Sequence, residues 1–202
     1  QQVGNYPGIT VEKREGRARH QGDLLHVADL PGTYSLTAYS REELAARDAL
    51  VRERPDVVVD VVDATNLERN LYLAVQLLEL GAPVVLALNM MDEAEKNGMR
   101  PDTAKLSQLL EVPVVETVAR AGLGRKELLN EAVRTASAGS DRPWHPLRIS
   151  YGPDLDPYLE KMAERIRETG FLTHLYPARW IALKYLEGDD QIIALGREHA
   201  GI

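Results

Sequence analysis

The chain of 202 residues contains no cysteine, which excludes disulfides and thiolate metal sites and fits a reducing compartment. It contains no run of about 18 consecutive apolar residues, so no segment is expected to span a membrane, and it opens without a basic, apolar leader. It also lacks an excess of positive charge, because its net charge is -7. A general nucleic-acid binder is therefore not expected.

What the sequence does contain is an alternation of short apolar runs and helical periods between residues 56 and 138. Strands are expected over 57–62, 83–88 and 112–118, and helices over 67–80, 102–110 and 124–136. Such an alternation predicts a parallel sheet with right-handed crossovers. Ligands bind outside the carboxyl ends of such strands, where we expect Asp29, Asp63, Asn89 and the loop 117–121.

The flanking segments follow other patterns. Residues 1–9 are rich in turn formers and are expected to be a loop, and the next two apolar runs are expected to form an antiparallel hairpin. A change of composition near residue 139 predicts two domains, 1–138 and 139–202, with a linker or long loop over 139–157. Further helices are expected over 42–52, 155–168, 178–186 and 190–198.

The first motif, Asp29-Leu30-Pro31-Gly32, directly follows an apolar run. A carboxylate at a strand end can hold Mg²⁺ through water, because Mg²⁺ keeps much of its hydration. Gly32 would let a backbone N–H approach a terminal phosphate without a Cβ in the way. When that phosphate leaves, the segment after it loses its tether, which predicts a switch. The alternative is an ordinary turn after a strand.

The second motif, Asn89-Met90-Met91-Asp92, follows the apolar run 83–88. Guanine offers two donors, N1–H and the 2-amino group, that fit one carboxylate side by side, and adenine lacks this pattern. Asp92 is therefore predicted to select guanine, with Asn89 bracing the neighbouring loop. The alternative is that Asp92 only caps the next helix. Because the two motifs occur in this order after strands, together they predict a GTP-binding site.

Two weaker candidates complete this site. Thr10 lies on a loop ahead of the hairpin, where its hydroxyl could complete the shell of Mg²⁺; alternatively it is a β-branched residue that starts a strand. Val118-Ala119-Arg120 follows the last expected strand, and Ala119 could present a backbone N–H to the guanine carbonyl. Any loop offers such amides, so this segment has meaning only beside the two motifs.

The sequence resembles the cytosolic N-terminal GTPase domain of FeoB-type ferrous iron transporters. The resemblance covers essentially the whole chain and is carried by 2–12, 29–36, 61–71, 87–92 and 179–189. The run after Asp29 and the run around Asn66 are its specific parts. It implies an α/β fold, a P-loop GTPase-like, mostly parallel sheet flanked by helices, with a C-terminal helical subdomain. It further implies a slow GTPase that binds GTP and GDP, because Thr33 stands where many small GTPases carry a catalytic glutamine.

The same resemblance assigns roles to individual residues. It places Mg²⁺ near Thr10 and Asp29, the guanine base near the segments 89–92 and 118–120, and a possible K⁺ on backbone carbonyls of Gly4 and Tyr6. The phosphates would lie near Gly8, Ile9, Thr10, Val11 and Glu12 and near the motif from Asp29 through Leu30 and Pro31 to Gly32. No catalytic side chain is assigned.

The resemblance also implies a setting for the domain. Its partner would be the membrane permease portion of the same polypeptide, at the cytoplasmic face of the bacterial inner membrane, and a homo-oligomer is compatible with it. The function implied is a nucleotide switch coupled to Fe²⁺ uptake.

Two departures from the family pattern carry expectations. Met90 stands where most GTPases have lysine, which predicts weak nucleotide affinity and fast GDP release. The chain has no Gly-x-x-x-x-Gly-Lys-Ser/Thr, the loop that cradles phosphates. As it stands, it is expected to lack the first strand and the phosphate loop, and in that form neither to fold well nor to hydrolyse GTP. The alternatives are a soluble ribosome-associated or tRNA-modifying GTPase, and a GTPase-like interaction module that does not hydrolyse.

Overall fold

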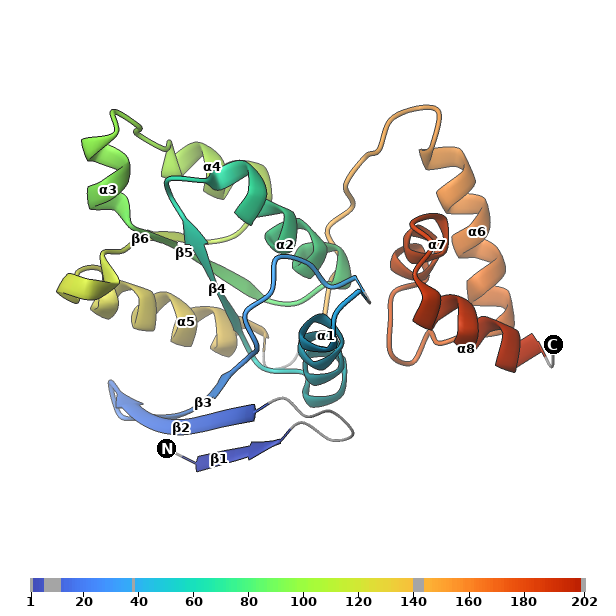
Figure 1. The fold of residues 1–202 in the computed structure, drawn as a ribbon, viewed down its shortest axis with the longest axis horizontal. Helices are drawn as coiled ribbons and strands as arrows, with labels where there is room; N and C mark the ends of the chain where they lie inside the picture. Colours follow the sequence, from blue (N-terminus) through green and yellow to red (C-terminus); the bar gives the residue numbers. More distant parts are fainter. Residues whose placement is uncertain (1, 6–11, 38, 140–143, 201–202) are drawn as a thin grey trace.

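The structure is a computed structural model that describes residues 2–5, 12–37, 39–139 and 144–200. Its centre is a parallel sheet in the order β4-β5-β6, formed by β4 (Val58–Asp63), β5 (Val84–Asn89) and β6 (Val114–Glu116). The helices α2 (Leu67–Leu80), α4 (Thr103–Leu110) and α5 (Arg125–Gly139) pack against these strands, with α4 and α5 on opposite sides (Figure 1). The predicted α/β fold with a parallel sheet is confirmed.

The burial of the strands follows this layering. All positions of β5 from Val84 to Leu88 are buried, because α2 covers one face and α5 the other. In β4 the burial alternates, so that Val59 and Val61 are exposed while Val58 and Val62 are buried. One face of β4 is therefore turned to solvent, and β4 is the first strand in the order β4-β5-β6 of the described residues.

The N-terminal strands form a separate antiparallel sheet in the order β1-β2-β3, from β1 (Gln2–Asn5), β2 (Glu12–His20) and β3 (Asp23–Asp29). The predicted hairpin is confirmed, and its turn contacts α5, where Asn130 Oδ1 lies 2.6 Å from His20 Nε2. The prediction that residues 1–9 are a loop is wrong for residues 2–5. Pairing with β2 makes them a strand, and such backbone pairing needs no apolar pattern.

Two helices show clear reasons for their ends. Helix α1 (Arg41–Glu53) begins with a capping box, in which Ser40 Oγ accepts from Glu43 N at 3.1 Å and Glu43 Oε2 accepts from Ser40 N at 3.0 Å. Helix α2 ends at Gly81, whose φ of 90° places it in the left-handed region that glycine adopts easily. A Cβ at Gly81 would lie 2.9 Å from Pro146 N.

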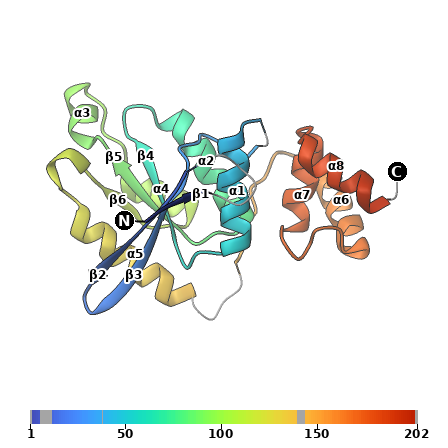
Figure 2. The same cartoon turned by 60° about the horizontal axis from the view of Figure 1, so that its bottom comes forward.

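The C-terminal part consists of α6 (Asp156–Thr169), α7 (Ala178–Leu186) and α8 (Asp190–Ala200). Both views place these helices on one side of the molecule, next to α1 (Figures 1 and 2). Their core centres on Trp180, which is 1% exposed and stacks on Tyr176 at 4.6 Å between ring centroids. The predicted helical subdomain is thus present. Within the ranges given above, no helix has the length and apolarity needed to cross a bilayer.

The segment 144–155 joins the two parts without forming a helix or strand. It lies against the end of α2, where Leu147 N donates to Leu78 O at 2.8 Å and Tyr151 Oη donates to Glu79 Oε1 at 2.8 Å. This segment falls within the long connection expected over 139–157. Helix α5 extends to Gly139 before it, and α6 begins at Asp156 after it.

Candidate guanine nucleotide site

The carboxyl ends of the parallel strands bring several predicted residues together. Asp63 ends β4 and is the direct register partner of Asn89, which ends β5. Asp63 Oδ1 accepts from Thr65 N at 2.8 Å and from Thr65 Oγ1 at 2.7 Å, so this carboxylate shapes the turn into α2. Thr117 continues β6 at the same edge through a bond from its N–H to Leu88 O at 2.8 Å.

Asn89 holds the loop that follows β6. Its Oδ1 accepts from Ala119 N at 3.0 Å and lies 3.3 Å from Thr117 Oγ1. The loop itself forms a single 3₁₀ turn, η1 (Ala119–Ala121), and Val118 pairs with Leu123 across its base. The predicted bracing of this loop by Asn89 is therefore seen in the hydrogen bonds.

Met90 and Asp92 lie at the start of a short helix, α3 (Met91–Lys96), which the sequence did not predict. Met90 precedes it as the N-cap residue with φ 61° and ψ 31°, a left-handed conformation that is uncommon for a non-glycine residue. The backbone thus turns sharply between Asn89 and Met91. Asp92 occupies the first turn of the helix and not its N-cap, so the capping alternative does not describe its position.

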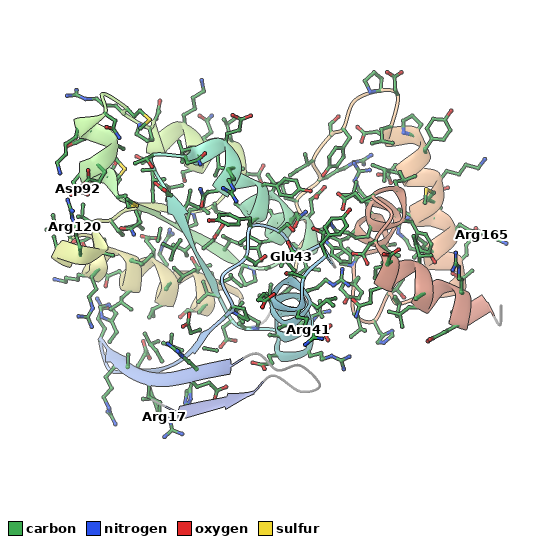
Figure 3. All side chains as sticks on the ribbon, in the orientation of Figure 1. Arg17, Arg41, Glu43, Asp92, Arg120 and Arg165 are labelled. Atoms are coloured by element: carbon green, nitrogen blue, oxygen red, sulfur yellow. The ribbon has the colours of Figure 1, made fainter. Side chains whose placement is uncertain are left out.

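The carboxylate of Asp92 has a partner on the opposite loop. Arg120 Nη2 contacts Asp92 Oδ2 and lies 2.7 Å from Glu93 Oε1, and Figure 3 shows Arg120 and Asp92 facing each other. The hydrogen bond from Arg120 is the main cause that lowers the pKa of Asp92 below its ordinary value. Asp92 is therefore held as a carboxylate, which is the form that accepts hydrogen bonds.

These groups surround a cavity of about 390 Å³ at the sheet edge. This volume is within the usual range of small-molecule sites. Its lining is formed by Thr65, Asn89, Met90, Asp92, Glu93, Asn97, Val118, Ala119 and Arg120. The segments 89–92 and 118–120 were predicted to meet, and they do meet here. Glu93 and Asn97 were not predicted, because they follow from the turn of α3, a helix too short to give a clear period.

The motif that begins at Asp29 lies at the end of a strand of the antiparallel sheet, not of the parallel one. Asp29 ends β3, which belongs to the antiparallel sheet and forms no ladder with β4 in the part of the chain that the structure describes. The prediction that Asp29 lies at the edge of the parallel sheet is therefore wrong as regards the sheet. The prediction placed the end of this hairpin at the edge of the parallel sheet, but β3 pairs with β2 and not with β4 among the described residues.

The segment after this motif is firmly attached to the two nearest helices. Leu30 packs on the core, and a Cβ added at Gly32, beyond Pro31, would meet no atom within 4 Å. Leu36 is buried, its N–H donates to Gln76 Oε1 at 2.5 Å, and its carbonyl accepts from Arg47 Nη1 at 3.3 Å. Gly32 is thus unobstructed, and the segment after it is held by hydrogen bonds to α1 and α2.

The remaining predicted residues lie at or beyond the limits of the structure. Gly4 is within β1 and Glu12 begins β2. Tyr6, Gly8, Ile9, Thr10 and Val11 fall outside the described residues. Their roles stay predictions.

Family models and known relatives agree with this geometry. The model of ferrous iron transport protein B matches residues 1–132, and the model of the FeoB cytosolic helical domain matches residues 151–202. The chain belongs to the FeoB family. Because the two models follow each other along the chain, it is a FeoB G domain with the helical domain that comes after it.

Individual FeoB proteins show how far the similarity extends. A fusion of Fe(2+) transport protein A and FeoB from Porphyromonas gingivalis is 49% identical over 191 residues, which are 94% of this chain and 22% of that protein. FeoB from Staphylococcus aureus is 37% identical over 94% of this chain and 28% of its own length. The chain thus spans about a quarter of the curated FeoB relatives that it matches.

A solved FeoB structure supports the fold. The cytosolic domain of T. maritima FeoB in a GDP form is 36% identical, with a TM-score of 0.88 over 98% of this chain and 76% of that structure. The chain therefore corresponds to about three quarters of that cytosolic domain.

Proposed function

We propose that the FeoB domain to which this chain belongs binds and hydrolyses GTP as the nucleotide switch of a ferrous iron transporter, coupled to Fe²⁺ uptake. The observation that carries the proposal is that Asn89, which holds the Ala119 N–H, and the Asp92 carboxylate line one cavity. Structures of the T. maritima FeoB cytosolic domain in GDP and GMPPNP forms support the choice of nucleotide.

The base would be recognised through complementary hydrogen bonds. Asp92 would accept from guanine N1–H and the 2-amino group, which makes a charge-assisted pair. Asn89 already uses Oδ1 to hold Ala119, so its amide nitrogen is the part left for the base edge. The Ala119 N–H donates to Asn89 Oδ1 in this structure, so it would reach the guanine carbonyl only by leaving Asn89. Adenine would leave one oxygen of this carboxylate without a donor, and so would bind less well.

The phosphates would lie toward the opposite motif. Asp29 is exposed at the end of β3, and a single carboxylate suits Mg²⁺, which keeps several waters and also binds phosphate oxygens. When bound, Mg²⁺ neutralises charge on the phosphates. Gly32 lies open to an approaching phosphate, as far as its own surroundings show. Thr10 would be the second Mg²⁺ ligand, as the resemblance to the family implies.

A change at Gly32 has a physical route to the helical subdomain. Both backbone groups of Leu36 are bonded, one to α2 and one to Arg47 on α1, and Arg47 in turn pairs with Asp189 between α7 and α8. We propose that the segment after Gly32 moves with the state of the terminal phosphate, and that this contact chain passes the movement on. The permease portion of the same polypeptide at the cytoplasmic face of the inner membrane is the proposed receiver.

The decisive test exchanges the base specificity. In Asp92→Asn one carboxylate oxygen becomes an amide donor, which suits the C2 carbonyl of xanthine instead of the 2-amino group of guanine. We expect GDP affinity to fall by about tenfold or more, as for the loss of a charge-assisted bond, and XDP affinity to rise. Glu95→Gln removes one exposed charge from the same helix and serves as the matched control. Unchanged preference for GDP in Asp92→Asn would refute the proposal.

Hydrolysis and its ions need a separate measurement. Phosphate release from GTP should be slow but dependent on Mg²⁺, and faster in K⁺ than in Na⁺ if the carbonyls of Gly4 and Tyr6 bind K⁺. Binding without any phosphate release would favour the interaction module that does not hydrolyse. Membership in the FeoB family removes the reason for the ribosome-associated alternative.

A homo-oligomer and the domain limits 1–138 and 139–202 stay parts of the proposal. Light scattering would test the first and limited proteolysis the second.

A further inference from the structure

The contact between Arg120 and Asp92 has a consequence for nucleotide affinity. Arg120 comes from η1 and reaches across the cavity to the first turn of α3, where Nη2 contacts Asp92 and lies 2.7 Å from Glu93 Oε1 (Figure 3). The three side chains are 63%, 29% and 33% exposed. The guanidinium therefore covers the carboxylate to which the proposed function assigns guanine.

Guanine and the Arg120 side chain compete for the same carboxylate oxygens of Asp92. Guanine in the bidentate arrangement uses both carboxylate oxygens, and Arg120 already donates to Oδ2. The hydrogen bond from Arg120 lowers the pKa of Asp92, so protonation does not release this pair near neutral pH. A carboxylate oxygen can accept more than one hydrogen bond, but the Arg120 guanidinium lies on this carboxylate at the lining of the cavity, so the arriving base competes with it at Oδ2.

Glu93 gives Arg120 a second partner when it moves. Glu93 Oε1 accepts from Arg120 at 2.7 Å and from Lys96 Nζ at 3.1 Å. Arg120 therefore does not lose all its charge pairing when it leaves Asp92. When guanine binds, Arg120 loses its ion pair with Asp92 and keeps the one with Glu93. The free-energy cost is therefore that of a single exposed ion pair.

We infer that Arg120 is an affinity-determining residue, which competes with guanine for Asp92 and keeps its ion pair with Glu93 when the base binds. This inference rests on the proposed function, because it takes Asp92 as the reader of guanine. An exposed ion pair corresponds to about two- to fivefold in a binding constant. Arg120 thus lowers guanine affinity by about that factor, independently of Met90.

The test uses guanosine as the probe, because it carries the base without phosphate charge. Guanosine affinity is measured with the complete chain by competition against labelled GDP. We expect Arg120→Gln to bind guanosine about two- to fivefold more tightly than the unaltered protein. Arg125→Gln removes an exposed charge from the start of the next helix and should leave the affinity unchanged.

Two further measurements distinguish competition from a general effect on the loop. Salt screens ion pairs, so guanosine affinity of the unaltered protein should rise between low and high NaCl, while that of Arg120→Gln should stay constant. Glu93→Gln removes the second partner and should weaken guanosine binding, because Arg120 then depends on Asp92 alone.

Several outcomes would overturn the inference. Equal or weaker guanosine binding by Arg120→Gln would show that the guanidinium supports the base, for instance by stacking over it. A salt response that is flat, or of opposite sign, would have the same meaning. If the unaltered protein binds GDP and Asp92→Asn loses it, the proposed function holds whatever Arg120 does. If no variant binds guanosine or GDP, both the function and this inference fail.

Discussion

Arg47 on α1 and Asp189 between α7 and α8 form an ion pair in which Nη1 lies 2.6 Å from Oδ2 and both side chains are fully buried. The two residues are 142 positions apart in the sequence. Trp180 lies beside the pair, with its ring centroid 5.7 Å from the Arg47 guanidinium carbon. This contact joins the G domain to the helical domain at a fully buried place.

Asp189→Asn should therefore be strongly destabilising. The substitution leaves the Arg47 charge buried without its counter-ion, and removal of one member of a buried pair costs about 3–5 kcal/mol. Urea unfolding should show this loss in the free energy of unfolding. Asp190→Asn, an exposed neighbour in the first turn of α8, should cost much less.

The double variant Arg47→Met/Asp189→Leu tests whether the unpaired Arg47 charge causes this loss of stability. If the loss comes from the unpaired charge, removing both charges should recover most of the stability. A double variant as unstable as the sum of the two single variants would contradict this account.

Asp60 should make stability depend on pH. This β4 carboxyl is 8% exposed, its Oδ2 has no hydrogen-bond partner among the described residues, and burial raises its pKa from 3.8 to about 6. Between these values the folded state binds more protons than the unfolded chain, so stability falls as the pH rises toward about 6. Asp60→Asn should stabilise the protein at alkaline pH by up to about 3 kcal/mol, and not at pH below 4.

The measurement for Asp60 is urea unfolding across this range of pH. Asp60→Asn should flatten the pH dependence, while Asp56→Asn, an exposed change just before β4, should leave it as it is. A slope that persists in Asp60→Asn would assign the effect to another group.

Gly81→Ala should be costly for two separable reasons. Alanine in the left-handed region costs about 1 kcal/mol, and its Cβ would also lie 2.9 Å from Pro146 N and 3.1 Å from His145 C. Gly98→Ala is the matched control, because Gly98 has φ 73° with nothing within 4 Å of the new Cβ. Thermal unfolding should show a larger loss at Gly81, and equal losses would mean that the segment 144–147 yields without cost.

Met90 should accept some side chains and reject others by backbone conformation alone. Its left-handed φ of 61° suits asparagine, so Met90→Asn should be neutral or stabilising by about 0.5–1 kcal/mol. Met90→Val should destabilise, because a β-branched side chain is poorly tolerated there. Urea unfolding of the two variants would compare them directly, and equal stability would show that this turn relaxes.

The elements that were predicted well are those with a strong period and a clear end. Helices α2 and α7 were predicted to the residue, since α2 combines an apolar stripe with Gly81 and α7 combines Trp180 with its neighbours at helical spacing. β1 and α3 were missed for the opposite reason. Each is short, and each depends on what it pairs with or follows, which the local sequence does not state.

The predictions about the site also divide into some that were met and some that were missed. Asn89 and Ala119 were predicted to meet because parallel strands bring their carboxyl ends to one edge. The hairpin that contains Asp29 was predicted, but its separation from the parallel sheet was not, because strand neighbours depend on long-range pairing. The contact of Arg120 with Asp92 was not predicted either, since it crosses 28 positions between two loops and leaves no trace in spacing or composition.

The attachment of the segment 144–155 to the end of α2 has a consequence for how the helical domain docks on the G domain. Leu147 and Tyr151 hold this segment at Leu78 and Glu79, so the free path from there to α6 is only a few residues long. A short tether gives its ends a high effective concentration. The helical domain would therefore stay within reach of α1 when the buried contact opens, and its return would be fast and independent of protein concentration.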